Sequence, residues 1–154
     1  MARSTPPAVA TLLVRPARVE DAPGISRLLG ILGYPCDEPD AAERVMAVRE
    51  DVNQTLLVAE SQLSLVGLVC CDLSYYLPLG APTCRITALA VVPGEQRQGV
   101  GRLLLRESEV LARAAGAVRI ELTSAGHRLE AHEFYRACGY GDGALRFIKR
   151  LGDA

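Results

Sequence analysis

The sequence predicts one domain of the mixed α/β (α+β) class over residues 1–154. Apolar runs with the spacing of strands alternate along the chain with segments whose apolar residues recur at helical spacing. The 154 residues have the length of one domain, and no internal repeat, low-complexity tract or linker divides them. A chain of this length buries roughly 68–70% of its unfolded surface, so we expect one core, preceded by a flexible tail over residues 1–10.

A helix is predicted from Asp21 to a stop at Gly33, because four apolar residues recur at the i, i+3, i+4 and i+7 spacing of one helix face. These residues are Ile25, Leu28, Leu29 and Leu32. A short strand over 12–16 precedes this helix. A second, weaker helix over 41–49 follows a proline-containing break.

Two strands over 55–59 and 65–73 come next, since both runs are rich in Leu and β-branched residues and only a short segment separates them, as in a hairpin. Residues 75–82 contain two prolines and one glycine and are predicted to form a loop. Its two tyrosines, Tyr75 and Tyr76, are candidates either for a substrate pocket or for anchoring the loop.

The second half of the chain continues the alternation of strands and helices. The run 84–92 is almost continuously apolar, which is typical of a strand buried on both faces. The remaining predicted elements are a helix over 99–115, a strand over 118–123, a helix over 129–138 and a final alternating strand over 145–151.

Composition and charge argue against several classes of function. The 17 basic residues nearly balance the 18 acidic ones, and the net charge of −1 argues against a dedicated nucleic-acid binder. No apolar stretch approaches the roughly 18 residues of a membrane helix. The five cysteines contain no CxxC pair, and the two histidines lack ligand partners at metal-binding spacing. We therefore expect a cytoplasmic protein with reduced thiols, no metal, no nucleic-acid partner and no membrane contact.

The segment from Leu89 to Leu105 has the pattern strand, glycine-rich loop, helix. The first turn of a helix has backbone N–H groups without intrahelical partners and a partial positive charge, and glycines allow an anion to approach them closely. A P-loop is excluded because Val100-Gly101 stands where Lys and Ser/Thr are required. A dinucleotide fingerprint lacks its third glycine, which is replaced by Leu104.

The remaining pattern, Gln96-Arg97-Gln98-Gly99-Val100-Gly101, resembles the pyrophosphate-binding signature of the GNAT superfamily of acyl-CoA-dependent N-acetyltransferases. Two further segments support this resemblance. The phrase from Ala131 to Tyr140 is similar to the family's Ala-x-x-Phe-Tyr-x-x-x-Gly-Phe/Tyr motif, and Val14-Arg15-Pro16-Ala17 looks like its first strand. Together with the order of the elements, the resemblance covers residues 12–151.

The resemblance implies the GNAT fold, with a central, mostly antiparallel sheet of six to seven strands and about four flanking helices. The fourth and fifth strands, here 84–92 and 118–123, would be parallel and splayed apart, so that the pantetheine arm of acetyl-CoA enters between them. The backbone of Leu89 and Val91 would pair with that arm. The backbone N–H groups implied to hold the pyrophosphate are those of Arg97, Gln98, Gly99, Val100, Gly101 and Arg102. The side chains of Arg97 and Arg102 could add positive charge near it.

The implied reaction is direct attack of a primary amine, from a small molecule or a peptide, on the thioester of acetyl-CoA as co-substrate. Tyr135 matches the family's acid, which protonates the departing thiolate, although a core aromatic on this helix is the alternative. Many members carry a Glu on the fourth strand, but the sequence 84–88 has no carboxylate. Glu121 and Asp72 are possible substitutes, and each has a purely structural alternative: an ion pair with Arg119 or Arg85 for Glu121, and a solvated strand end for Asp72.

Because the Glu of the family's fourth strand is missing, a second hypothesis is a catalytically silent acyl-CoA sensor of the same fold. Cys84 lies near a loop and could be reactive, whereas Cys70, Cys71 and Cys138 are predicted to be small core residues. Dimers are common in the family, so a homodimer is also open, although no interface can be identified in the sequence.

Overall fold

The computed structural model describes residues 11–95, 99–123, 129–143 and 145–152. Its internal contacts divide the chain into two compact units, Met1–Thr123 and Ser124–Ala154. Unit 1 holds a sheet with helices α1, α2 and α3, and unit 2 holds helix α4. The single domain over residues 1–154 stays a prediction.

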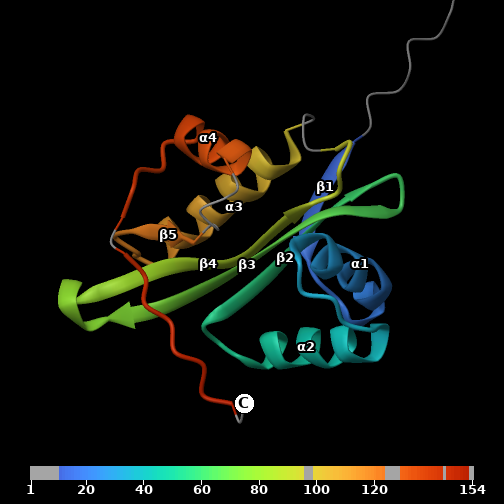
Figure 1. The fold of residues 1–154 in the computed structure, drawn as a ribbon, viewed down its shortest axis with the longest axis horizontal. Helices are drawn as coiled ribbons and strands as arrows, with labels where there is room; N and C mark the ends of the chain where they lie inside the picture. Colours follow the sequence, from blue (N-terminus) through green and yellow to red (C-terminus); the bar gives the residue numbers. More distant parts are fainter. Residues whose placement is uncertain (1–10, 96–98, 124–128, 144, 153–154) are drawn as a thin grey trace, which may run out of the picture. The chain divides into compact units, whose positions relative to one another are not determined.

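Unit 1 is built on a five-stranded sheet with the order β1-β2-β3-β4-β5, so each strand lies beside its neighbour in sequence (Figure 1). The first four strands pair antiparallel, and β5 pairs parallel to β4. The strands are β1 (Leu12–Pro16), β2 (Gln54–Ser61), β3 (Ser64–Tyr76), β4 (Ala81–Val91) and β5 (Ile120–Leu122). This arrangement is the predicted mixed α/β class, with the predicted parallel pair.

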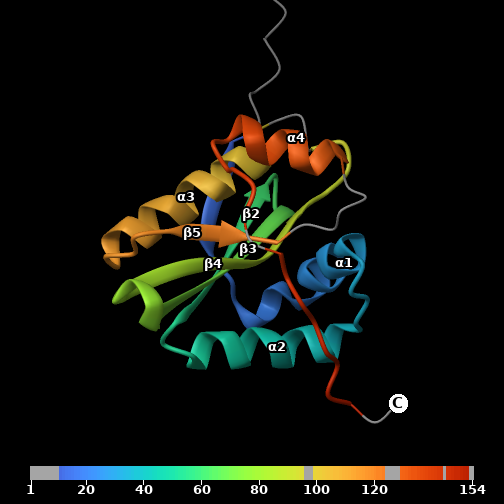
Figure 2. The same cartoon turned by 60° about the vertical axis from the view of Figure 1, so that its left-hand side comes forward.

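Helices α1 (Ala22–Leu32) and α2 (Glu38–Glu50) cover one face of the sheet, and α3 (Val100–Ala114) covers the other (Figure 2). Neighbouring residues of β3 contact the helices on opposite faces, because successive residues of a strand point to opposite sides of the sheet. Leu68 packs in a core cluster with α1 and α2, whereas Gly67 lies against Val100 and Leu104 of α3. The cluster on the first face includes Ile25, Leu28, Ala41, Val45, Val58, Leu68 and Ala90.

Local sequence signals explain where these elements begin and end. Helix α1 ends at Gly33, whose φ of 101° is the left-handed conformation that glycine adopts without strain. Helix α2 begins earlier than predicted, at Glu38. The Asp37 side chain caps it by accepting a hydrogen bond from the Asp40 N–H at 2.8 Å, and Pro39 fits within the first turn.

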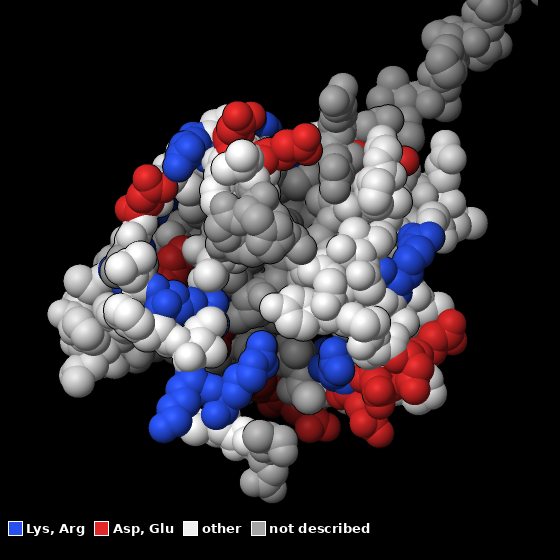
Figure 3. Space-filling view, viewed as in Figure 1, with Lys and Arg blue, Asp and Glu red and all other residues white. Residues whose placement is uncertain are grey.

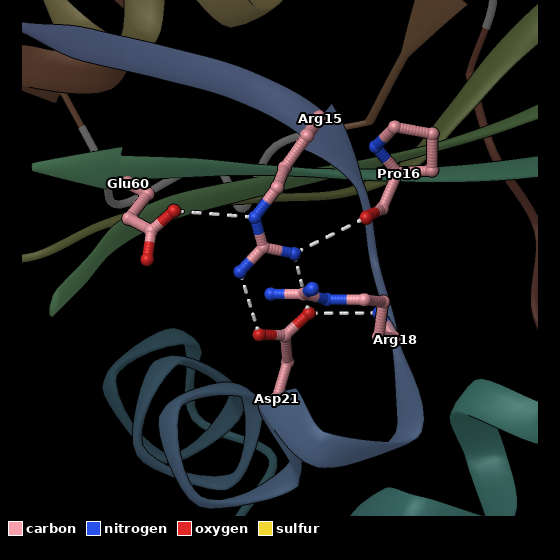
Figure 4. A network of polar contacts seen from close by, with 5 residues as sticks. All are labelled: Arg15, Pro16, Arg18, Asp21 and Glu60. Carbon is pink, nitrogen blue, oxygen red and sulfur yellow. Dashed lines mark hydrogen bonds and ion pairs between the residues drawn. The ribbon is translucent and has the colours of Figure 1, made fainter. Parts of the chain in front are cut away.

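An ion-pair network ties β1 to β2 and to the start of α1 (Figure 4). Arg15 donates to both carboxylate oxygens of Asp21 at 2.8 Å, and its Nε lies 3.2 Å from Glu60 Oε2. The Arg18 N–H also donates to Asp21, at 2.7 Å. The Asp21 side chain is only 8% exposed, so this bidentate pair is shielded from solvent. The hydrogen bonds from Arg15 lower the pKa of Asp21.

The two strand predictions nearest the C-terminus need correction. The strand predicted over 118–123 is confirmed only for Ile120–Leu122. Residues 145–151, predicted as a final strand, form none where the structure describes them, and Phe147 and Leu151 are more than 90% exposed. Alternation alone does not make a strand, because its backbone needs a neighbouring strand. The described part of unit 2 contains helix α4 (Leu129–Ala137) but no strand with which residues 145–151 could pair.

The described residues therefore contain five strands rather than the six to seven that the resemblance implied. The loop predicted over 75–82 is also shorter than expected. Strand β3 continues to Tyr76 and β4 begins at Ala81, so only a single turn over Leu77–Leu79 and Gly80 joins them. Within the described ranges, no helix has the length and apolar character that crossing a membrane requires.

Replacing Asp21 with Asn tests the Arg15 network. The substitution should lower the free energy of unfolding near pH 7 by about 2 kcal/mol, since hydrogen bonds to charged groups contribute roughly 1.5–3 kcal/mol. Because the folded-state pKa of Asp21 is lowered, its contribution is present above the ordinary carboxyl pKa of about 3.9 and is lost as the pH falls through the folded-state value.

Urea unfolding near pH 7 and near pH 3 measures both effects. The difference between wild type and Asp21→Asn should shrink at the lower pH. The exposed Glu43→Gln on α2 is the matched control and should change stability by less than about 0.5 kcal/mol. An Asp21→Asn variant as stable as the wild type near pH 7 would show that the network contributes nothing.

Candidate active site

Strands β4 and β5 are paired at only one end of β4. The register joins Cys84, Arg85 and Ile86 to Ile120, Glu121 and Leu122. Immediately after this segment β4 contains a bulge, because Ile86 and Ala88 lie opposite Cys71 and Cys70, which leaves Thr87 as an extra residue. A bulge bends its strand and increases the local twist. The bulge therefore coincides with the point where the two parallel strands stop pairing.

The second half of β4 leads from this point to the glycine loop. Leu89 and Val91 lie here, half-buried, opposite Val69 and Gly67 of β3. Beyond Val91 the chain turns at Gly94, which has a φ of 93°. The predicted pantetheine-binding residues are thus on the part of β4 that runs past the pairing with β5.

Helix α3 begins at Gly99, whose φ of 79° places it in the left-handed region. The first bond within the helix runs from the Leu103 N–H to the Gly99 carbonyl at 2.9 Å. The N–H groups of Val100, Gly101 and Arg102 belong to the first turn, where the helix itself supplies no acceptor. A Cβ built on Gly99 would meet nothing within 4 Å, and the first turn contains no acidic residue.

The predicted contacts Arg97 and Gln98 lie outside the described residues. Of the remaining loop residues, Val100 and Gly101 are buried, whereas Gly99 and Arg102 are exposed. The described start of α3 thus combines a positive helix end, an exposed arginine and open space above a glycine, which together suit an anion.

Gly67 sets how closely the start of α3 can approach the sheet. A Cβ at this position would lie 2.9 Å from Val100 Cγ1, 3.0 Å from Leu104 Cδ1 and 3.1 Å from the Ala90 carbonyl oxygen. Both helix residues are fully buried, so they have little freedom to move away. The close approach holds the N-terminus of α3 against the second half of β4.

Tyr135, the predicted acid, is in unit 2. It lies on α4 between two aromatic neighbours, with ring centroids 5.4 Å from Phe134 and 6.4 Å from Tyr140. The helix ends at Gly139, with a φ of 95°, and the Tyr140 N–H donates to the Tyr135 carbonyl at 3.0 Å. The motif residues therefore pack together within unit 2, with Tyr135 half-buried.

The two carboxylates considered as bases both have partners. Glu121 forms ion pairs with Arg85 Nε at 3.3 Å and with Arg119 Nη2 at 3.4 Å, which is its structural alternative. Asp72 accepts a hydrogen bond from the Ser74 hydroxyl. Asp72 also lies within β3 rather than at a strand end, because β3 continues to Tyr76.

The thiol considered as reactive, Cys84, is fully buried. A hydrogen bond with Cys71 and burial both raise the pKa of its thiol, so the nucleophilic thiolate is disfavoured. Cys70 and Cys71 are buried strand residues, and all five cysteines are free. Within the described ranges, no group of three or more His, Cys, Asp or Glu side chains could hold a metal ion.

The model of the Acetyltransferase (GNAT) family matches residues 27–140, which include β2 to β5, α3 and α4. Among curated proteins, the aminoalkylphosphonate N-acetyltransferase of Salmonella typhimurium is 34% identical over 87 residues. That match covers 56% of this chain and 56% of the Salmonella protein, so it spans about half the length of each.

Solved structures share the fold at low sequence identity. A transcriptional regulator from Bacillus halodurans has a TM-score of 0.84 at 21% identity, with 92% of this chain and 100% of that chain covered. An aminoglycoside N-acetyltransferase solved in complex with CoA has a TM-score of 0.81 at 12% identity, with 95% and 99% covered. These similarities establish the architecture.

Gly67→Ala tests the close approach of α3. The added methyl group would force Val100, Leu104 or the β4 backbone to move, and overpacking of this kind costs about 1–3 kcal/mol. Gly30→Ala is the matched control, because Gly30 is an exposed residue of α1 and an added Cβ would meet nothing within 4 Å.

The control should stabilise the protein by about 0.5–1 kcal/mol, since alanine is the better helix former. Thermal or urea unfolding of both variants measures the two effects. Equal stability of Gly67→Ala and the wild type would mean that the packing of α3 on the sheet does not require glycine at position 67.

Proposed function

Because this chain belongs to the GNAT acetyltransferase family, we propose that it transfers the acetyl group of acetyl-CoA to a primary amine of a small molecule or a peptide. The observation that carries this proposal is the end of the described β4–β5 pairing at Ile86, after which the rest of β4 leads to the glycine loop and the start of α3. This part of β4 offers backbone groups for an amide-containing arm, and the helix start offers donors for a pyrophosphate.

The proposed acetyl-CoA contacts are those that the family resemblance implies, and the described geometry supports them. The backbone of Leu89 and Val91 pairs with the pantetheine amides as an added strand would. The N–H groups from Arg97 to Arg102, including those of Gln98, Gly99, Val100 and Gly101, hold the pyrophosphate. The open space above Gly99 and the absence of an acidic side chain in the described first turn of α3 fit such a group.

The proposed chemistry is direct transfer. The amine nitrogen attacks the thioester carbonyl, so a C–N bond forms, the C–S bond breaks and CoA leaves as a thiolate. The Tyr135 hydroxyl donates a proton to that thiolate, a role supported by its place in the family motif. The amine must also lose a proton, and an alkyl ammonium has a pKa of about 10.4.

No side chain is assigned as the base. Glu121 is engaged by two arginines and Asp72 by Ser74, and β4 carries no carboxylate. A water molecule can accept the ammonium proton, and an acceptor amine of low pKa needs little help. The free thiols of all five cysteines support the proposal that the protein works in the reducing cytoplasm.

Titration with acetyl-CoA tests the binding half of this proposal. Saturation at about 100 times Kd should stabilise the protein by about 2.7 kcal/mol, seen as a rise in Tm, and nucleotides without the pantetheine arm should stabilise it less. Release of CoA thiol with a panel of amines then tests catalysis. Binding without turnover on any amine would identify a silent acyl-CoA sensor, and no binding would refute both functions.

Tyr135→Phe tests the proposed acid. Removing only the hydroxyl should leave the Kd for acetyl-CoA within about twofold and should lower kcat by about 10²-fold, the lower end of the effect of a positioned acid. Calorimetry measures the first quantity and thiol release the second. Unchanged kcat would remove Tyr135 from the chemistry, and a parallel loss of binding would assign it a structural role.

A further inference from the structure

Two arginines and a glutamate form a charged cluster on the β4–β5 pair, next to the proposed acetyl-CoA site. Arg85 on β4 and Arg119 just before β5 both approach Glu121, at 3.3 Å and 3.4 Å. We propose that Arg85 and Arg119, positioned by Glu121, bind an anionic group of the acceptor, so that the substrate is a short primary amine carrying a phosphonate or a similar oxyanion. This inference rests on the proposed function and names its substrate class.

The cluster has spare capacity for an anion. Each guanidinium has five N–H donors, and the ion pairs with Glu121 use only part of them. Glu121 and Asp72, which lies opposite Arg85 in the β3–β4 register, balance the two positive charges, so an anion would be held by the unused N–H donors rather than by an excess of charge. Arg85 is 57% exposed and Arg119 44% exposed, so both can reach a solute. Planar guanidinium groups bind phosphonate and carboxylate oxygens in bidentate fashion.

The cluster is also held in place. The Arg119 guanidinium lies over the Tyr76 ring, 5.0 Å from its centre, in a cation–π contact. Glu121 bridges the two arginines across the β4–β5 pair. A preorganised pair of cations loses less entropy on binding than two independent side chains. Glu121 is therefore a positioning residue, and the arginines contact the ligand.

All three side chains belong to the sheet face opposite α3. Cys84 and Ile86, on either side of Arg85, are buried, and Cys84 contacts Cys71, which in turn contacts Ser108 of α3. Arg85 therefore points to the opposite face, where α1 and α2 pack farther along the sheet. The acceptor group would lie on that face, while the start of α3 belongs to the other.

The cluster is close to the proposed point of reaction. Arg85 precedes the Thr87 bulge by two residues, about 7 Å along a strand at roughly 3.3 Å per residue. This short backbone separation favours an acceptor with only a short carbon chain between its anion and its amine. The Salmonella relative, named for aminoalkylphosphonates, is compatible with that size.

A matched pair of acceptors tests the proposal. The kcat/KM for 2-aminoethylphosphonate is compared with that for propylamine, which has a similar length and no anion. The wild type should favour the phosphonate by about 10- to 100-fold, as expected for charge-assisted hydrogen bonds. Arg85→Gln and Arg119→Gln should each lower kcat/KM for the phosphonate at least about tenfold, mainly through KM, and leave propylamine within about twofold.

Arg113→Gln, at the far end of α3, removes the same charge and should change neither acceptor by more than about twofold. Equal use of both acceptors by the wild type would overturn the inference while the proposed function stands. A parallel loss for both acceptors in the Arg85 and Arg119 variants would show that the cluster is merely structural.

Calorimetric titration of 2-aminoethylphosphonate into the CoA-bound protein separates the two proposals if no amine is acetylated. Binding by the wild type that is lost in Arg85→Gln would support the anion site even though acetyl transfer had failed. No binding by the wild type would refute the anion site.

Discussion

The bulge at Thr87 lies where the described pairing of β4 and β5 ends, and the two proposed sites of unit 1 lie on either side of it. Before the bulge, three residues of each strand are in register and include Arg85 and Glu121, with Arg119 just before β5. After it, β4 continues to Val91 paired with β3, beyond the described pairing with β5, and leads to the start of α3. One extra residue thus separates a paired segment, proposed to bind the acceptor, from an edge proposed to bind acetyl-CoA.

The proposed sites for these two ligands belong to different faces of the sheet. On one face, Gly67 allows α3 to pack so closely that its N-terminus is fixed beside β4. On the other face, α1 and α2 cover part of the sheet, and the Arg15–Asp21–Glu60 network holds the beginning of α1 to β1 and β2. Charges are also separated on the surface, with acidic side chains gathered toward the right-hand end of α2 in Figure 3. A net charge near zero therefore hides local charge of both signs.

Sequence reasoning found the backbone features of the candidate site more easily than its side-chain partners. Gly99 was predicted at the start of α3 because glycine and apolar spacing are local signals, and Leu89 was placed correctly on β4. The start of α2 lies earlier than the sequence predicts, because Pro39 resembles a break although it fits the first turn of a helix that Asp37 caps. The bulge could not be predicted, since it depends on the register between β3 and β4, and nothing in the sequence of β4 alone fixes that register.

The sequence by itself determined the order of the elements and the family, because helix faces, glycine stops and the two motifs are properties of neighbouring residues. Only the tertiary structure decided which distant residues meet. It placed Glu121 between Arg85 and Arg119, buried Cys84 beside Cys71, and left residues 145–151 without strand pairing. The physical reason is the same in each case: an ion pair, a raised thiol pKa and a strand all require a partner from elsewhere in the chain, and local sequence does not specify that partner.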